Sequence, residues 1–188
     1  MGRIVVTEFV SLDGVMEAPG GDDGFVRGQW SFEFDRGDDG NEFKTNETMD
    51  ADALLLGRKT YEGFANAWPE RDGEFADKFN TMPKYVVSST LKDPDWGGTT
   101  VISGDVPAEL AKLRDEVDGY VIVHGSRQLV QTLIENDLVD ELRLMIFPVA
   151  LGTGKRLFGE TDESKKFKLK ESKTVGSDGV VTQVFERA

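Results

Sequence analysis

The 188-residue chain contains no cysteine and a single histidine. Without cysteine it forms no disulfide and carries out no thiolate chemistry. Zinc sites are usually built from several cysteine and histidine ligands. The lack of cysteine and the single histidine therefore argue against zinc, and we expect no metal site. A chain without disulfides also fits the cytoplasm, where thiols are kept reduced, and we predict that location.

Long apolar stretches are missing as well. No run approaches the roughly 20 apolar residues that a membrane-spanning helix needs. The first three residues lead directly into the strand-like Ile4-Val5-Val6, without the apolar segment of a signal peptide. We therefore expect no contact with a membrane. The 38% of hydrophobic residues, which include 12 Phe, are enough for one folded core.

Basic residues are scarce relative to acidic ones. The chain has 22 Lys and Arg against 35 Asp and Glu, which gives a net charge of −13. Nucleic-acid binding depends on Lys and Arg that neutralise phosphates, so this balance disfavours a nucleic-acid partner. An anionic small molecule that approaches so acidic a protein needs a local basic pocket.

Two segments combine a short apolar strand, a glycine and the start of a helix: ALLLGRKT at 53–60 and YVIVHGSR at 120–127. A helix N-terminus offers an anion unpaired backbone N–H groups and a partial positive charge. Arg58, Lys59 and Thr60 add two full charges and a hydroxyl to the first of these turns. Two such turns predict a ligand with more than one phosphate, such as a dinucleotide. The alternative is that Arg58 and Lys59 are ordinary charges on a helix surface.

Strand-like and helix-like segments alternate along the chain. Strands are predicted at 3–12, 53–56, 84–88, 99–102, 120–123, 140–148, 167–175 and 180–186, and helices at 41–51, 58–67, 74–80, 107–116 and 126–136. The first helix is expected to point Phe43 and Met49 inward, with Thr45 or Thr48 as further candidates for the inner side. The stretch 15–39 is a long loop whose aromatic residues argue against disorder, and we expect it to act as a lid. This order predicts one α/β domain over residues 1–188: a mostly parallel central sheet with helices on both faces and a C-terminal antiparallel hairpin.

Polar residues follow several of the predicted strands. They are Asp13-Gly14, Ser88-Ser89 and His124-Gly125-Ser126. Parallel sheets bind ligands at the carboxyl ends of their strands, so these residues are expected to converge on one site. Each also has a simpler interpretation: a plain turn for Asp13-Gly14, a strand end for Ser88-Ser89, and a packed core residue for His124.

The segments resemble a known family. LLGRKTYE at 55–62 and KYVVSS at 84–89 are similar to the Gly-Arg turn and the serine-ending strand of dihydrofolate reductases. SLDGVME at 11–17 and the segment 139–154 are more similar to the reductase domain of bifunctional riboflavin-biosynthesis deaminase-reductases and its small stand-alone relatives. The resemblance runs from residue 3 to residue 186. It implies a dihydrofolate reductase-like three-layer fold that binds NADPH.

The resemblance also implies roles for individual residues. The nicotinamide of NADPH would face the backbone near Thr7 and the turn at 12–16. The residues that would hold its pyrophosphate and its 2′-phosphate are Gly57, Arg58, Lys59, Thr60, Ser88, Ser89, Gly125, Ser126, Arg127 and Gln128. Two cations beside a 2′-phosphate favour NADPH over NADH.

The catalytic acid departs from the family pattern. Dihydrofolate reductases carry a buried carboxylate early in the helix before the Gly-Arg strand, and here Asn41 stands nearest to that place by spacing. An amide cannot serve as that acid, so Asp13 and Glu42 are our candidate catalytic residues. Asp39, Glu8 and water remain open as alternative proton donors.

The leading hypothesis is an NADPH-dependent reductase that transfers hydride to a C=N or C=O bond of a small pterin- or pyrimidine-like substrate. A second hypothesis, favoured by the unmatched acid, is a nucleotide-binding protein of the same fold without turnover. A third is a purely structural α/β domain. Aromatic residues outside the core and the apolar C-terminal hairpin indicate a homodimer.

Overall fold

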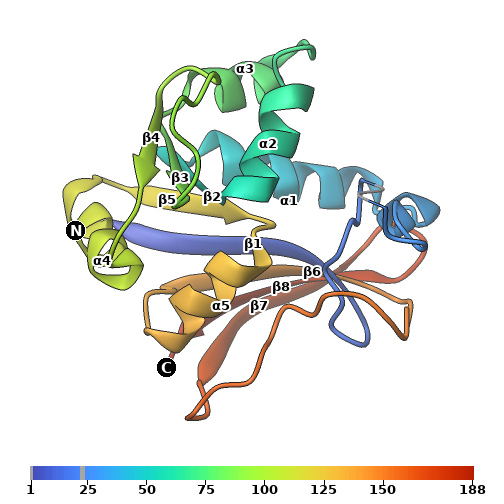
Figure 1. The fold of residues 1–188 in the computed structure, drawn as a ribbon. Coiled ribbons are helices and arrows are strands. Elements are labelled where there is room, and N and C mark those ends of the chain that lie inside the picture. The colour runs from blue at the N-terminus through green and yellow to red at the C-terminus, as the bar shows by residue number, and fades with distance from the viewer. Residues whose placement is uncertain (1, 22–23) are drawn as a thin grey trace.

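Eight strands form one sheet in the computed structural model, which describes residues 2–21 and 24–188 (Figure 1). The strands are β1 (Arg3–Ser11), β2 (Ala53–Gly57), β3 (Lys84–Val87), β4 (Thr99–Ile102), β5 (Tyr120–His124), β6 (Glu141–Phe147), β7 (Phe167–Val175) and β8 (Val180–Arg187). Their order across the sheet is β4-β3-β2-β5-β1-β6-β8-β7. The first six run parallel, β8 is antiparallel to β6, and β7 is antiparallel to β8. The predicted parallel sheet with its C-terminal antiparallel hairpin is confirmed.

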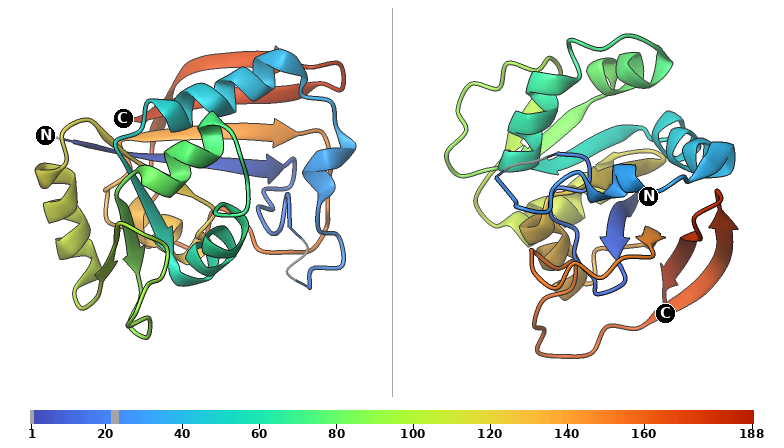
Figure 2. Two further views of the ribbon diagram at one scale, coloured as in Figure 1. Left: turned by 90° about the horizontal axis from the view of Figure 1, so that it is seen from above. Right: turned by 90° about the vertical axis from the view of Figure 1, so that its right-hand side faces the viewer.

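Helices cover both faces of this sheet. They are α1 (Gly37–Met49), α2 (Arg58–Ala67), α3 (Glu74–Thr81), α4 (Val106–Glu116) and α5 (Arg127–Glu135), with a short 3₁₀ helix, η1 (Trp30–Glu33). Apolar residues of α4 and α5 pack with Val6 and Val10 of β1, while those of α2 and α3 pack on the opposite face. Figure 2 shows α1 beside the β7–β8 hairpin, on the same side of the sheet as α2 and α3. The three-layer α/β fold is therefore also confirmed.

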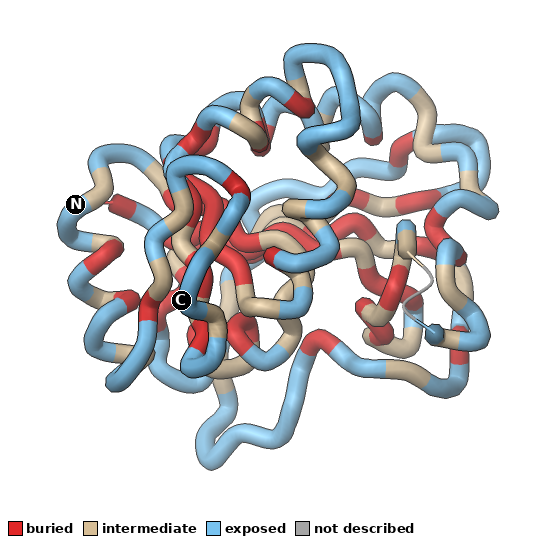
Figure 3. The backbone as a smooth tube through the Cα atoms, turned by 45° about the horizontal axis from the view of Figure 1, so that its top comes forward, coloured by how far each residue is buried: buried red, intermediate tan, exposed pale blue. Residues whose placement is uncertain are grey.

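Strand β1 lies in the middle of the sheet, between β5 and β6, and the buried residues gather along these central strands (Figure 3). Alternate β1 side chains face opposite layers, so Thr7 and Phe9 point toward α1 while Val6 and Val10 point toward α5. Thr7 is paired with His124, the last residue of β5. The rest of β1 therefore continues past the end of β5 and lies beside the turn that follows it.

The bounds of the first helix differ from the prediction. It runs over Gly37–Met49 rather than 41–51, and Met49 is 37% exposed instead of facing inward. Its buried residues are Gly40, Glu47 and Thr48. The helix has only two apolar side chains, so apolar periodicity gave a poor guide to its inner face. The bounds of α2, β4 and β7 coincide with those predicted.

The long loop after β1 is partly packed. Trp30 in η1 is 2% exposed and meets Phe147 edge to face at 5.4 Å, whereas Phe32 is 71% exposed. Residues 22 and 23 of this loop lie outside the described residues. Across the described ranges, no helix has the length and apolarity required to cross a membrane. The same ranges contain no cluster of three or more His, Asp and Glu residues arranged to hold a metal ion.

Candidate cofactor and substrate site

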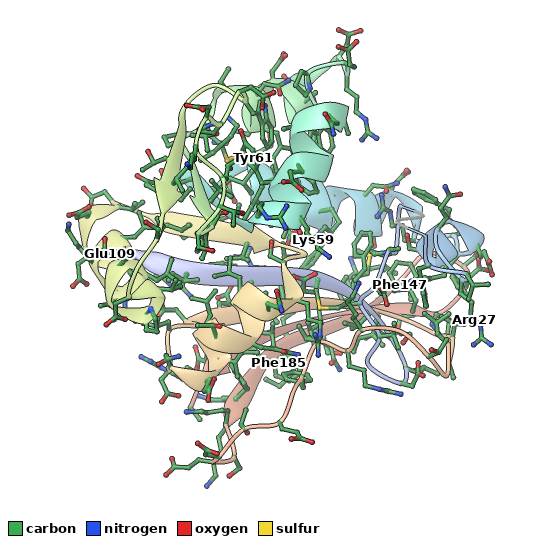
Figure 4. The ribbon with its side chains drawn as sticks, in the orientation of Figure 1. Arg27, Lys59, Tyr61, Glu109, Phe147 and Phe185 are labelled. Carbon is green, nitrogen blue, oxygen red and sulfur yellow. The ribbon has the colours of Figure 1, made fainter. Side chains whose placement is uncertain are left out.

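The first predicted phosphate turn joins β2 to α2 with no intervening loop. Gly57 ends β2 and caps α2, which begins at Arg58. Lys59 is exposed at this end of α2 (Figure 4), and Arg58 forms an ion pair with Glu62 at 2.7 Å. The two side chains of that pair are 40% and 46% exposed. Exposed pairs of this kind contribute little energy, so Arg58 is held loosely and can turn toward an anion.

The second predicted turn joins β5 to α5. Gly125 and Ser126 have φ angles of 54° and 60°, so two successive residues adopt the left-handed conformation. The chain reverses sharply and α5 begins at Arg127 without a side-chain cap on its first backbone N–H groups. Arg127 donates from Nε to the carbonyl of Arg156 at 3.0 Å, and Gln128 is exposed. Uncapped N–H groups at a helix start are what an anion needs.

The two turns are bonded to each other. The N–H of Gly57 donates to Oγ of Ser126 at 2.9 Å, and the N–H of Ser126 donates to Oγ1 of Thr60 at 3.0 Å. A Cβ atom on Gly125 would lie 3.2 Å from the Thr60 side chain, so glycine permits this close approach. The fold thus joins the N-termini of α2 and α5 at the carboxyl ends of β2 and β5. We call residues 57–60 and 125–128 the two-turn cradle.

Ser88 and Ser89 follow β3, the neighbour of β2 on its outer side. Ser88 is 8% exposed, and its hydroxyl oxygen accepts hydrogen bonds from the N–H groups of Thr90 and Leu91. Ser89 is exposed. Ser88 therefore shapes its own loop, while Ser89 presents a hydroxyl that a ligand from solution can reach.

Thr7 lies on the other side of β1, facing α1. Its hydroxyl donates to the Glu47 carboxylate, 2.8 and 2.9 Å from the two oxygens, and accepts a hydrogen bond from Nζ of Lys44 at 2.7 Å. Lys44 also forms an ion pair with Glu47. Thr7 and Glu47 are 2% and 1% exposed. We call Thr7, Lys44 and Glu47 the buried triad, since its members satisfy one another away from water.

The candidate acid Glu42 is not part of this arrangement. It lies on the exposed face of α1, and the nearby Asp39 forms an ion pair with Lys173 of β7 at 2.7 Å. The helical turn brings Glu47, five residues later in the chain, against β1 instead. The structure therefore places the Glu42 carboxylate away from the sheet, and its catalytic role stays a prediction.

The other candidate acid, Asp13, anchors a distant loop. Its carboxylate accepts a hydrogen bond from the Ser11 hydroxyl at 2.6 Å and from the N–H groups of Leu151 and Gly152 at 3.0 and 2.7 Å. These bonds, led by that of Ser11, lower the pKa of Asp13 to about 2. A carboxylate with so low a pKa is ionised at neutral pH, so the geometry favours loop anchoring over proton donation.

Lys44 and Glu47 are the site residues that sequence reasoning missed. Gly40, Lys44 and Glu47 recur at helical spacing in a segment with almost no apolar side chain. A helix that packs on a sheet without an apolar stripe must turn polar residues inward, and these must then pair. The helical spacing of these residues was the sequence signal that could have identified the inner face of α1.

His124 is a packed residue rather than a reactive one. Its ring lies 5.4 Å from that of Phe79 and 6.1 Å from that of Phe64. Burial, helped by the nearby charge of Lys44, holds the pKa of His124 well below its usual range. The imidazole is therefore neutral at physiological pH.

Comparison with known proteins identifies relatives over almost the whole chain. The family model described as the RibD C-terminal domain matches residues 3–181. YyaP from Bacillus subtilis strain 168 is 29% identical over 97% of this chain and 94% of its own length. YwjB from the same organism is 28% identical over 89% of this chain and 88% of its own length.

Solved structures share the fold. A putative riboflavin biosynthesis protein from Shewanella sp. PV-4 has a TM-score of 0.79 at 22% identity and covers 99% of both chains. A pyrimidine reductase-like protein from Corynebacterium diphtheriae has a TM-score of 0.67 at 12% identity, covering 99% of this chain and 92% of that one. Dihydrofolate reductase from Enterococcus faecalis, in complex with NADP(H), has a TM-score of 0.59 at 17% identity, covering 98% and 96%. The resemblance to the dihydrofolate reductase fold and its riboflavin-pathway branch is confirmed, and the chain belongs to the RibD C-terminal domain family.

Proposed function

We propose that this chain is an NADPH-dependent reductase that acts on a small pterin- or pyrimidine-like heterocycle. The observation that carries the proposal is the two-turn cradle, in which two helix N-termini meet beside Arg58 and Lys59. Such a cradle suits a ligand with two linked phosphates. The reductase-like family and fold support the class of reaction.

The cradle residues fit the polar groups of a dinucleotide. Gly57, Gly125 and Ser126 offer close backbone approach to a pyrophosphate, with Arg127 and Gln128 at the start of α5. Lys59 and Arg58 would bind a 2′-phosphate, aided by Ser89 after β3. When bound, NADPH supplies the hydride. The chain's own work is to bind and orient it and to exclude water.

The α1 side of β1 offers the substrate face. The Phe9 ring lies 5.0 Å from Nζ of Lys44 and 5.4 Å from the Arg36 guanidinium, and Thr7 and Glu47 lie close by. An aromatic ring flanked by hydrogen-bonding and cationic groups suits a flat, polar ring system. This combination supports a heterocyclic substrate.

The cofactor half of the proposal is tested by titrating the protein with NADPH and with NADH while following nicotinamide fluorescence. We expect Lys59→Ala to weaken NADPH binding about tenfold and to leave NADH binding unchanged, because only NADPH carries the 2′-phosphate. Lys112→Ala removes another exposed lysine, on α4, and should change neither affinity. Failure of the wild-type protein to bind either nucleotide would overturn the proposal.

A nucleotide-binding protein without turnover is the second candidate. It is favoured by the positions of Glu42 on the solvent face and of Asp13 in a loop anchor. Oxidation of bound NADPH in the presence of dihydropterin and aminopyrimidine substrates separates the two. Turnover with any of them supports the reductase, whereas tight NADPH binding without turnover across the panel supports the second candidate.

A further inference from the structure

Glu8 is a buried carboxyl group beside the two-turn cradle. It is 5% exposed, and its Oε1 atom has no hydrogen-bond partner among residues 2–21 and 24–188. Thr7 is paired with the last residue of β5, so Glu8 lies level with the next residue, Gly125. Strand alternation points its side chain to the α5 side of the sheet, like Val6 and Val10. A carboxyl group thus sits under the turn where α5 begins.

The surroundings of Glu8 favour its neutral form. Burial raises the pKa of Glu8 well above its usual range, and neither the charge of Lys44 across the strand nor the nearby backbone N–H of Gly125 offsets it. Glu47, also across the strand, raises the pKa further. From β6, its cross-strand neighbour is the apolar Leu144. Within the described ranges no cation forms an ion pair with Glu8, in contrast to Glu47 in the buried triad.

A neutral carboxyl group has a donor that needs an acceptor. Its hydroxyl can donate one hydrogen bond, and a buried donor left without an acceptor destabilises the protein. Among the described residues nothing accepts from Oε1. An incoming ligand would satisfy this donor if it placed an acceptor oxygen at the start of α5, and phosphate oxygens are strong acceptors.

We propose that Glu8 donates a hydrogen bond, as a neutral carboxylic acid, to a pyrophosphate oxygen of the dinucleotide bound at the start of α5. This assignment rests on the proposed cofactor site and adds to it a binding residue from β1. It also gives the site a dependence on pH. An ionised Glu8 loses its donor and repels the pyrophosphate, so the nucleotide binds the protonated form.

Two substitutions separate the effects of the hydrogen-bond donor, the charge and the volume of the Glu8 side chain. Glu8→Gln keeps an N–H donor of similar size but cannot ionise, whereas Glu8→Leu keeps much of the volume and has no donor. We expect Glu8→Leu to weaken NADPH and NADH about tenfold each, because both carry the pyrophosphate. This differs from Lys59→Ala, whose loss is confined to NADPH. Glu8→Gln should bind both within about threefold of wild type at pH 7.

The pH profile tests the proton. Above the pH at which Glu8 ionises, wild-type affinity for NADH should fall about tenfold per pH unit, whereas that of Glu8→Gln should stay flat. NADH is the informative ligand since it has no 2′-phosphate to titrate. Glu109→Gln makes the same chemical change at an exposed carboxylate on α4 (Figure 4) and should keep the wild-type profile.

Thermal unfolding of the same variants separates binding from structure. Glu8→Leu removes an unsatisfied buried donor, so its Tm should equal or exceed that of wild type while its nucleotide affinity falls. A lower Tm with unchanged affinity would mean that Glu8 only supports the α5 turn, and would overturn the inference. A wild-type profile as flat as that of Glu8→Gln would also overturn it. If wild type binds neither nucleotide, the proposed function itself is wrong.

Discussion

The two-turn cradle and the buried triad both carry charged side chains, but they use them differently. Lys59 is exposed in the cradle, and the Arg58 side chain is 40% exposed. In the triad the side chains of Lys44 and Glu47 are 12% and 1% exposed and pair with each other. A solvated charge interacts weakly with its neighbours and remains available, whereas a buried charge must be paired where it lies.

This difference separates binding of the cofactor from structural support. The triad joins α1 to the middle strand through Thr7, so its charges are committed to holding the helix on the sheet. The cradle is held together by backbone and hydroxyl groups, which leaves the exposed Lys59 and the loosely paired Arg58 available to an anion. We therefore expect substitutions in the triad to change stability and substitutions in the cradle to change binding.

Glu47→Ala should give the largest effect on stability. It leaves the ammonium of Lys44 nearly buried without its counter-charge, and breaking a buried pair in this way costs about 3 kcal/mol. Urea denaturation measures the loss. Glu42→Ala, on the exposed face of the same helix, should change the free energy of unfolding by less than about 0.5 kcal/mol. Similar losses in the two variants would show that the triad does not hold α1 in place.

Gly125→Ala should break the cradle with an intermediate effect. Its φ of 54° strains any residue with a Cβ atom, and that atom would meet Thr60 at 3.2 Å. We expect a loss of about 1–2 kcal/mol in unfolding free energy, together with weaker NADPH binding because α2 and α5 are pushed apart.

Gly63→Ala is the matched control. A Cβ on Gly63 meets nothing within 4 Å, and the residue lies inside α2. Because alanine favours helix, this variant should be more stable by about 0.5–1 kcal/mol. Equal behaviour of the two glycine variants would show that the left-handed turn is not required.

The difference between the cradle and the triad also explains which features could be predicted from the sequence. The cradle is made of two continuous segments, each with a strand, a glycine and a helix start in order, so local patterns were enough to find Gly57 and Gly125. The fold was predictable for the same reason, since most strands and helices carry their own apolar period and end signals. The hydrogen bonds between the two turns were not predictable, because they depend on how β2 lies beside β5.

The triad could not be found in this way. Thr7 and Glu47 are 40 positions apart, and their contact exists only once α1 is packed on β1. Spacing along the helix suggested Asn41 and Glu42, but α1 begins earlier than the apolar pattern indicated. The inner face of a helix with few apolar residues is set by pairing between distant polar groups, which no local pattern reports.

The turn around Asp13 shares features with the cradle and with the triad: it is a local turn, and it carries a charge fixed by distant groups. It gives the smallest predicted effect on stability. Its Asp-Gly pair is a turn that the sequence predicts, but the Asp13 carboxylate is fixed by the distant N–H groups of Leu151 and Gly152. The folded pKa of Asp13, about 2, is below the value in an unfolded chain, about 3.9. The carboxylate therefore stabilises the fold at pH above the unfolded value, and this contribution disappears as the pH falls toward 2.

Urea denaturation of wild type and Asp13→Asn between neutral pH and pH 2.5 measures this contribution. The variant should be less stable at neutral pH, and the difference should shrink below about pH 4, where Asp13 in the unfolded chain takes up its proton. Asp38→Asn, at an exposed position of α1, should differ from wild type by a constant amount or not at all. A difference for Asp13→Asn that stays constant with pH would mean that turn geometry, rather than the charge of Asp13, holds the distant loop. The turn would then belong with the cradle, whose framework is built without charges.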